Sequence, residues 1–238
     1  MARGRAMSNT ARSQILARIR HASRRANAAD IEQELSALGT APAAPMPSAD
    51  LCTAFLANVL ANQGTAACAQ NRSQAVKAVA AYVYEHYRSQ RLVAGHDPRL
   101  AAMPWRDAGV LPRFGAAEDG DVVALSFARL GIAETGAIVT FTGRANPAAN
   151  NLMPERHIVL IDSADLVMDM EAAWRRIGAE VEAAGRPRGI NFIAGPSSTA
   201  DIEAQLVHGA HGPTGWHVIL TGAVPDTALS EARSLIGQ

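Results

Sequence analysis

Residues 189–203 read Gly-Ile-Asn-Phe-Ile-Ala-Gly-Pro-Ser-Ser-Thr-Ala-Asp-Ile-Glu, and this stretch is the clearest indication of the fold. The apolar run over 190–193 predicts a buried strand, and the Gly-Pro pair at 195–196 predicts a turn after it. The residues that follow predict a helix over 200–208. A strand that leads through a short turn into a helix is the repeating unit of an α/β fold.

The turn after this strand is also the position at which we predict a ligand. In open α/β sheets, ligands bind where the carboxyl end of a parallel strand meets the start of a helix. The free backbone N–H groups there can bind a carboxylate or a phosphate. The alternative is a well-capped helix without a ligand. We predict an anion-binding loop, made by Gly195, Pro196, Ser197, Ser198, Thr199 and Asp201.

The predicted helix is followed by a glycine-flanked loop that contains His211 and Gly212. The charge state of an imidazole changes near neutral pH, so a histidine beside an anion site can contact the ligand or transfer a proton. We therefore treat His211 as a candidate catalytic residue and Gly212 as part of the ligand loop. The alternative is an exposed histidine with no role in chemistry.

A second constellation, Gly131-Ile-Ala-Glu-Thr-Gly136, connects two apolar strands. The carboxylate of Glu134 lies between glycines that permit close backbone approach, and it could act as a nucleophile or a base. Thr135 and Gly136 would complete a ligand-binding turn. The alternative is a polar turn residue whose carboxylate is hydrogen-bonded to the backbone.

Outside these segments the chain alternates between helical patterns and short apolar runs, which predicts an α/β fold with a mainly parallel sheet in three layers. Residues 143–147 carry an ordinary turn signal, and we interpret Asn150 and Asn151 as loop residues. The predicted helices span 50–62, 72–88 and 168–184; the further predicted strands span 65–69, 92–94, 122–125, 137–141, 158–161 and 218–220.

The first part of the chain differs in character from the rest. Apolar residues at helical spacing predict helices over 10–25 and 30–38, and the stretch 40–48 contains three prolines and is typical of an extended linker. We predict a helical N-terminal arm with its linker over 1–47 and one main domain over 48–238. The arm begins with seven Arg and no acidic residue in 25 positions. We interpret this as a cationic solvated helix in preference to a transit peptide, with Met7 as an alternative start.

Composition excludes several functions. The formal net charge is zero, which argues against nucleic acid as a partner. No apolar run approaches the ~18 residues that span a bilayer, so we expect no membrane insertion and a cytoplasmic location. His86 and His157 lack companions that could ligate a metal with them, and we predict no metal site. Two cysteines cannot supply the four thiolates of an iron–sulfur cluster, and no dinucleotide fingerprint is present, so we expect no redox cofactor in this chain.

Several of these segments together resemble the lactate-utilisation protein C family, which is built on the LUD domain. The family pattern G-P-S-R-T-A-D-I-E is similar to residues 195–203, although this chain has Ser198 where the family has Arg. That loss removes a bidentate anion contact. The resemblance covers roughly residues 90–222, and its matching pieces are 132–136, 153–159, 193–203, 207–213 and 216–220.

The resemblance implies a fold like that of the CoA-transferase, ribose-5-phosphate isomerase and glucosamine-6-phosphate deaminase group. It also implies a subunit of a complex that oxidises L-lactate to pyruvate, together with partner proteins that carry iron–sulfur clusters. Two alternatives stay open. One is a stand-alone CoA- or acyl-transferring enzyme that uses Glu134, because class I CoA transferases place a catalytic Glu in a similar E-x-G turn. The other is a non-catalytic ligand-binding or assembly subunit.

Overall fold

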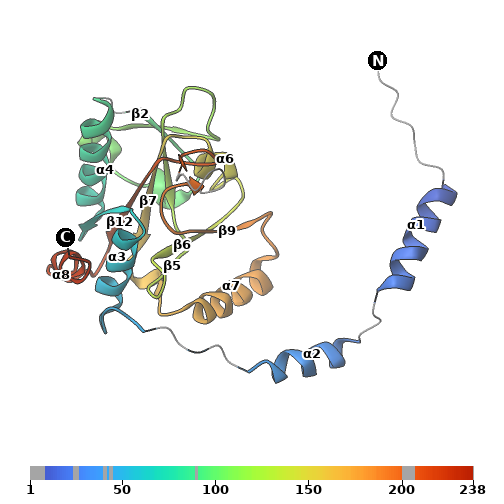
Figure 1. Ribbon diagram of the computed structural model, residues 1–238. Coiled ribbons are helices and arrows are strands. Elements are labelled where there is room, and N and C mark those ends of the chain that lie inside the picture. Colours follow the sequence, from blue (N-terminus) through green and yellow to red (C-terminus); the bar gives the residue numbers. More distant parts are fainter. Residues whose placement is uncertain are drawn as a thin grey trace, which may run out of the picture. The chain divides into compact units, whose positions relative to one another are not determined.

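The computed structural model describes residues 9–23, 27–39, 42, 45–88, 91–199 and 207–237. The chain divides into two compact units, Met1–Ala43 and Ala44–Gln238, and the division falls inside the proline-rich stretch 40–48. Among the described residues, no helix combines the length and the apolar character needed to cross a lipid bilayer. The labels below follow Figure 1.

The first unit contains the two predicted helices, α1 (Asn9–Ala22) and α2 (Ala28–Ala37). The side chain of Asn27 caps α2 by accepting a hydrogen bond from the backbone N–H of Asp30 at 2.8 Å. Gly39 follows the helix with a φ of +69°, which is the left-handed conformation that ends helices. The apolar stripes of both helices are exposed; their larger members are Ile15, Leu16, Ile19, Ile31, Leu35 and Leu38.

The second unit is built on a six-stranded sheet in which every neighbouring pair of strands is parallel, as the sequence predicts. The strand order is β1-β12-β7-β4-β2-β3. β4 and β12 are buried along their whole length because layers cover both faces of the sheet. The strands are β1 (Thr65–Ala69), β2 (Arg91–Ala94), β3 (Leu111–Phe114), β4 (Val123–Phe127), β7 (Arg156–Asp162) and β12 (Gly215–Thr221).

A second, four-stranded sheet has the order β8-β5-β6-β9 and contains two strands that the sequence assigns to the parallel sheet. That assignment is wrong for residues 137–141 and 190–193, because β6 pairs with β5 and β9 in antiparallel register. The short connection between β5 and β6 permits only a hairpin, since a parallel crossover needs a dozen or more residues. The strands are β5 (Leu130–Ile132), β6 (Ala137–Phe141), β8 (Leu166–Val167) and β9 (Ile190–Ile193).

Helices and the second sheet cover the two faces of the parallel sheet (Figure 1). α4 packs on one face, where its Val76, Val79 and Val83 join one core cluster. The other face meets α3 and the second sheet, and α7 covers the far side of that second sheet. The main helices are α3 (Leu51–Ala61), α4 (Arg72–Tyr87), α7 (Met170–Ala184) and α8 (Ala228–Leu235); the short ones are α5 (Pro98–Ala101), α6 (Ala148–Leu152), η1 (Trp105–Ala108) and η2 (Ser163–Asp165).

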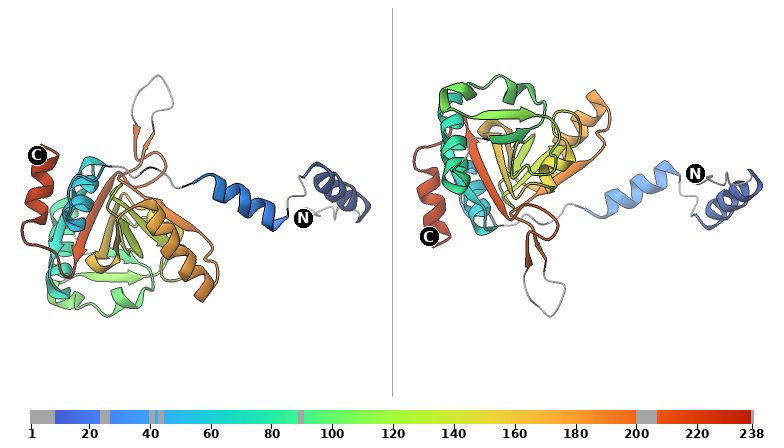
Figure 2. Two further views of the ribbon diagram at one scale, coloured as in Figure 1. Left: turned by 90° about the horizontal axis from the view of Figure 1, so that it is seen from below. Right: turned by 90° about the horizontal axis from the view of Figure 1, so that it is seen from above.

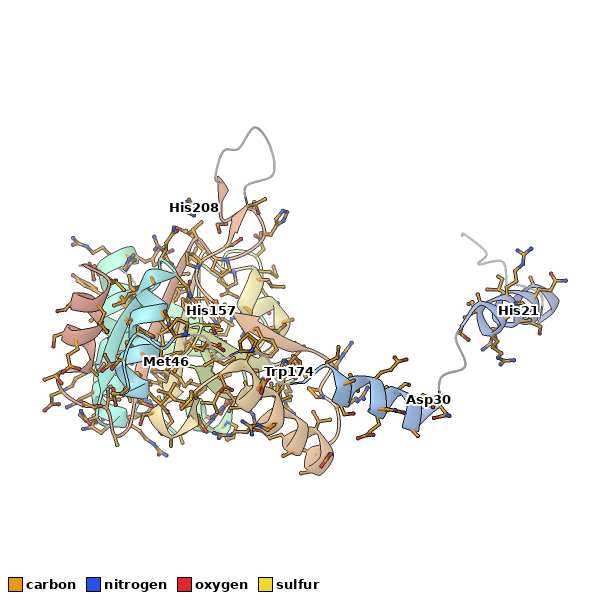
Figure 3. The ribbon with its side chains drawn as sticks, turned by 60° about the horizontal axis from the view of Figure 1, so that its bottom comes forward. His21, Asp30, Met46, His157, Trp174 and His208 are labelled. Carbon is orange, nitrogen blue, oxygen red and sulfur yellow. The ribbon has the colours of Figure 1, made fainter. Side chains whose placement is uncertain are left out.

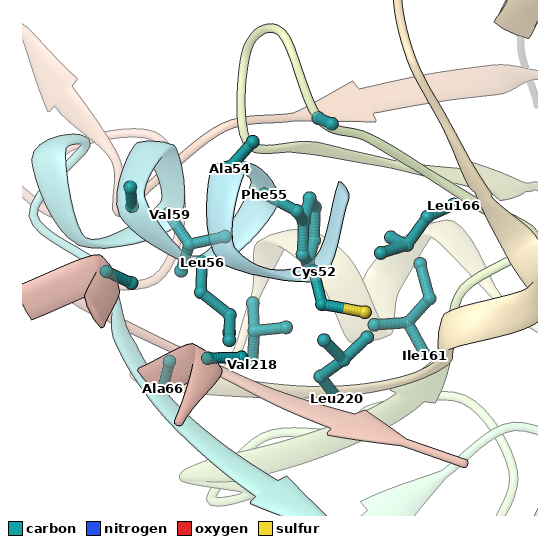
Figure 4. Close-up of a cluster of buried hydrophobic side chains, with 14 of the residues drawn as sticks. Cys52, Ala54, Phe55, Leu56, Val59, Ala66, Ile161, Leu166, Val218 and Leu220 are labelled. Carbon is teal, nitrogen blue, oxygen red and sulfur yellow. The ribbon is translucent and has the colours of Figure 1, made fainter. Parts of the chain in front are cut away.

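α3 is the helix that the rest of the domain surrounds. The side chain of Asp50 caps it by accepting a hydrogen bond from the N–H of Thr53 at 2.7 Å. Phe55 and Leu56 are fully buried, and they pack with Val218 and Leu220 of β12 in the cluster drawn in Figure 4. Burying a side chain of this size contributes about 1.5–3 kcal/mol. Val59 and Leu60, in the C-terminal half of α3, are buried in the same cluster.

The helix predicted over 200–208 is wrong where the structure describes it. Ser198–Thr199 forms the strand β10, and Val207–His208 forms β11. The two strands pair in antiparallel register, Ser198 with His208, and form the hairpin seen in Figure 2. The serine and threonine residues at 197–199 suggested a helix cap, but threonine also favours strands. Cross-strand pairing between β10 and β11 outweighs the local preference for a helix.

Candidate functional site

The turn between β5 and β6 is held on α3 by side-chain amides. The Nδ2 of Asn58 donates to the carbonyl oxygens of Ala133 at 2.7 Å and Glu134 at 3.0 Å. The Nδ2 of Asn62, one helical turn further on, donates to the carbonyl of Thr135 at 2.8 Å. These three bonds satisfy carbonyl groups that the tight turn leaves without strand partners. The candidate turn 134–136 is therefore fixed in place.

The carboxylate of Glu134 has a structural partner. Its Oε2 accepts a hydrogen bond from the backbone N–H of Met170, the first residue of α7, at 3.1 Å. Its own backbone N–H donates to the carbonyl of Met168 at 2.9 Å. A negative charge at a helix N-terminus is stabilised by the free amides there. Glu134 thus ties the turn to α7, and the residue is half-buried.

Two glycines bring the predicted ligand segments against the end of α3. Gly136 has a φ of +68°, and a Cβ at this position would lie 2.5 Å from the backbone carbon of Asn58. Gly195 has a φ of +105°, and a Cβ there would lie 2.4 Å from the carbonyl oxygen of Asn62. Only glycine combines this backbone conformation with such close approach. The structure therefore brings Thr135, Gly136 and Gly195, which belong to two separately predicted motifs, to the same end of α3.

The amides of the loop after Gly195 are arranged differently from the prediction. The N–H of Ser197 donates to the carbonyl of Pro213 at 2.8 Å, and its carbonyl accepts from Gly209 at 2.9 Å. A Cβ on Gly212 would lie 3.2 Å from that of Ser197, so the two arms are in contact. The free helix amides on which the anion site was predicted are thus not available at Ser197.

The remaining predicted site residues have the following positions. His211 is exposed, and so is His208 on β11, which Figure 3 shows at the hairpin. Ser198 and Thr199 lie in β10, while Pro196 is half-buried in the bend before it. Asp201 lies outside the described residues. Ligand binding or catalysis by any of these residues stays a prediction.

A buried polar cluster lies between the two sheets, and sequence reasoning missed it. The Oγ of Ser126 on β4 donates to the Oδ1 of Asn146 at 2.8 Å and lies 2.9 Å from the Nε2 of His157 on β7. The Nδ2 of Asn151 donates to the hydroxyl of Thr140 on β6 at 3.1 Å. All five residues are buried, and Figure 3 shows His157 inside the domain. The cluster joins the parallel sheet to the second sheet.

The imidazole of His157 is neutral in this setting. Burial lowers its pKa to about 4, because a charged ring would lose its hydration without a compensating anion. With Ser126 donating to Asn146, the Nε2–H of His157 donates to Ser126, and Nδ1 is a bare acceptor. Within the part of the chain that the structure describes, neither this Nδ1 nor the Nδ2 of Asn146 has a hydrogen-bond partner.

The sequence contained a signal for this cluster. Asn146, Asn150 and Asn151 were interpreted as turn or loop residues, yet all three are buried, and the last two belong to α6. The carbonyl of the Asn150 side chain accepts from the N–H of Ala117 at 2.7 Å. Three asparagines within six residues, beside a serine in an otherwise apolar strand, are the pattern of a buried hydrogen-bond network.

These features define an α/β domain with a parallel six-stranded sheet and a second sheet that shares a polar cluster with it. Residues 117–221 match the model of the LUD domain family, so this part of the chain is similar to LUD domains. The matched stretch contains the polar cluster, the turn at 134–136 and both arms of the hairpin. Among the described residues, no three His, Cys, Asp or Glu side chains gather in a way that could hold a metal ion.

Several proteins similar to this chain are named lactate utilization protein C. The chain is 31% identical over 144 residues to lactate utilization protein C of Halalkalibacterium halodurans, covering 55% of this chain and 62% of that protein. It is 40% identical over 92 residues to the protein of that name in Shouchella clausii, covering 38% of this chain and 40% of the relative. The chain thus spans about half the length of the curated relatives it matches.

A solved structure has a similar fold. A DUF162 family protein from Deinococcus radiodurans aligns over 72% of this chain and 96% of its own, with a TM-score of 0.53 and 21% sequence identity. At that identity the likeness concerns the fold alone. It agrees with the mainly parallel α/β architecture described above.

Proposed function

We propose that this chain acts in lactate utilisation, as a subunit of a system that oxidises L-lactate to pyruvate. The observation that supports this is the LUD domain match over residues 117–221, together with relatives named lactate utilization protein C. Oxidation of lactate to pyruvate removes two electrons and two protons; one hydrogen leaves the hydroxyl-bearing carbon and the other leaves the hydroxyl oxygen. An electron acceptor is therefore required.

We place that acceptor in partner proteins that carry iron–sulfur clusters. A cluster of this kind needs four cysteine thiolates, and the chain has two cysteines. Cys52 is buried in the core around α3, and burial raises the pKa of its thiol. The pKa of Cys68 is raised to about 11, chiefly by burial. Both residues are thus protonated thiols at neutral pH and poor ligands.

Growth on lactate tests the role of the chain. A strain that lacks the gene, and has no other lactate oxidase, should stop growing on L-lactate but grow normally on pyruvate, because only the step between the two is lost. Reintroducing the gene should restore growth. Unimpaired lactate consumption in the deletion strain would contradict the proposal.

A substitution at His211 tests whether the predicted ligand loop takes part. His211 is exposed, so His211→Gln should leave the urea unfolding midpoint unchanged. If its imidazole transfers a proton, lactate oxidation by the reconstituted system should fall at least ~10-fold. His208→Gln, also exposed and in the neighbouring strand, is the matched control and should keep full activity. Equal activity in both variants would show that His211 has no chemical role.

A further inference from the structure

A cavity of about 240 Å³ opens at the carboxyl edge of the parallel sheet, away from the segments that the sequence singled out. Its walls include Phe127 at the end of β4, Asp162 at the end of β7 and Thr221 at the end of β12, and Gln70 follows β1. These four strands are neighbours and all run in one direction. The carboxyl edge of such a sheet is where α/β proteins bind their ligands.

One wall of the cavity is positively charged. Arg72, the first residue of α4, is exposed and has no ion-pair partner within the described part of the chain. The side chain of Asn71 caps the helix by accepting from the N–H of Gln74 at 3.0 Å. α4 is 16 residues long, so its N-terminus adds a partial positive charge beside the guanidinium. This wall would attract an anionic group such as a carboxylate.

Arg99 also lines the cavity, and its pairing with Asp97 means that it adds no net charge. Its Nη2 and Nε donate to both oxygens of Asp97, at 2.7 and 3.0 Å. Its guanidinium carbon lies 3.9 Å from the centre of the Phe127 ring. A planar guanidinium held by one carboxylate and one aromatic ring is a rigid surface. Arg99 is therefore preorganised, and Arg72 is the cation that remains for a ligand.

Asp162, another lining residue, offers an acceptor. The Oδ1 of Asp162 accepts from the backbone N–H of Ala164 at 2.9 Å, and no hydrogen bond to its Oδ2 is recorded within the described residues. Gly222 approaches this carboxylate closely, because a Cβ there would lie 2.9 Å from the Oδ1 of Asp162. A carboxylate accepts hydrogen bonds and cannot donate them. Asp162 therefore favours a ligand hydroxyl and disfavours a ligand carbonyl.

We propose that this cavity binds a small 2-hydroxy acid of the size of L-lactate. Arg72 and the start of α4 would bind the carboxylate, and the free oxygen of Asp162 would accept the hydrogen bond of the 2-hydroxyl group. The volume lies below the ~300–1,000 Å³ of pockets for larger ligands. The identity of the acid rests on the proposed function, whereas the preference for hydroxyl over carbonyl follows from Asp162 alone.

Calorimetric titration of the full chain tests this site, with L-lactate, pyruvate and inorganic phosphate as three separate probes. We expect L-lactate to bind more tightly than pyruvate, whose carbonyl oxygen would face the carboxylate of Asp162. Arg72→Gln should weaken L-lactate binding about 10-fold or more, the usual result of losing a charge-assisted hydrogen bond. Lys77→Gln removes a positive charge from the same helix outside the cavity and should leave binding unchanged.

Asp162→Asn tests directly whether the carboxylate of Asp162 causes the preference for L-lactate over pyruvate. An asparagine Oδ1 can still accept from Ala164, so the fold should be kept, while its new NH₂ group can donate to a carbonyl. We expect the preference for L-lactate over pyruvate to shrink or reverse in this variant. A wild-type chain that binds no L-lactate, binding that Arg72→Gln leaves intact, or binding of phosphate alone would each overturn the proposal.

The outcomes for the site and for the cellular role can be separated. If the deletion strain does not grow on lactate, but substitutions at Arg72 and Asp162 leave the affinity for L-lactate unchanged, the proposed function stands and the proposed site is wrong. If L-lactate binds as described but the deletion strain consumes lactate normally, the cavity is a 2-hydroxy-acid site and the proposed function is wrong.

Discussion

Gly136→Ala is expected to destabilise the domain by at least ~3 kcal/mol. The residue has a φ of +68°, which costs an alanine roughly 1–2 kcal/mol. The added methyl would also lie 2.5 Å from the backbone carbon of Asn58 and 2.6 Å from the backbone nitrogen of Val59. Both atoms belong to a buried helix, so the contact cannot be relieved by rotating a side chain. Urea unfolding of the full chain measures the change.

Gly120→Ala is the matched control for this substitution. Gly120 has a φ of +87°, but nothing lies within 4 Å of the position that its Cβ would occupy. In Gly120→Ala the free energy of unfolding should therefore fall only by the cost of a positive φ for alanine, about 1–2 kcal/mol. The difference between the two variants isolates the close approach of the turn to α3. Equal losses would show that the turn can move away from the helix, which would undermine the site geometry described above.

Acidification from pH 7.5 to pH 5 is expected to cost the domain about 4 kcal/mol through two buried histidines. Burial lowers the pKa of His157 to about 4. The pKa of His217 is also lowered to about 4, by burial first and by the nearby His86 second. His217 stacks on Tyr82, and its Nδ1 lies 2.8 Å from the hydroxyl of Thr65.

The sign follows from proton uptake by the unfolded chain. An unfolded histidine binds a proton below its ordinary pKa of about 6.5, whereas both buried rings stay neutral until about pH 4. Stability is therefore complete above pH 6.5 and falls as the pH drops toward 4. Each ring contributes about 2 kcal/mol of the loss at pH 5, where most carboxylates are still ionised.

Substitutions at His157 and His217 test whether these two residues cause the loss of stability on acidification. His157→Gln and His217→Gln should each remove about half of the difference in unfolding free energy between pH 7.5 and pH 5. The difference between the two pH values is the readout, so it holds even where a variant is less stable throughout. His211→Gln, which removes an exposed imidazole, should leave the difference intact. A pH-independent stability in the wild-type chain would contradict the buried, neutral histidines.

Much of the fold could be predicted from local patterns. α3 and α4 begin where the sequence predicts helices to start, and the side chains of Asp50 and Asn71 cap them. The apolar runs that became β4, β7 and β12 are buried because continuous runs suit a sheet covered on both faces. The resemblance to the LUD domain was confirmed over residues 117–221.

The meeting of the two motifs around Gly136 and Gly195 could not be predicted from the sequence. They meet on α3 through Asn58 and Asn62, and not at the carboxyl edge of the parallel sheet. Ligand binding or catalysis by these motifs stays a prediction. The contacts of Asn58 and Asn62 could not be predicted from the sequence, because polar residues near the C-terminal end of a helix usually face solvent. The anion loop was misplaced because its strand, β9, pairs antiparallel with β6.

The sequence by itself determined most of the helices and of the strands in the parallel sheet, since these depend on residues close together in the chain; residues 207–208, predicted as helix and found as strand, are an exception. Only the tertiary structure decided which sheet each strand joined, which amides stayed free and which polar groups met. Those outcomes depend on pairing between distant segments, such as Ser198 with His208 and Ser126 with Asn146. Local preference is worth tenths of a kcal/mol per residue, and a buried hydrogen bond or strand pair outweighs it.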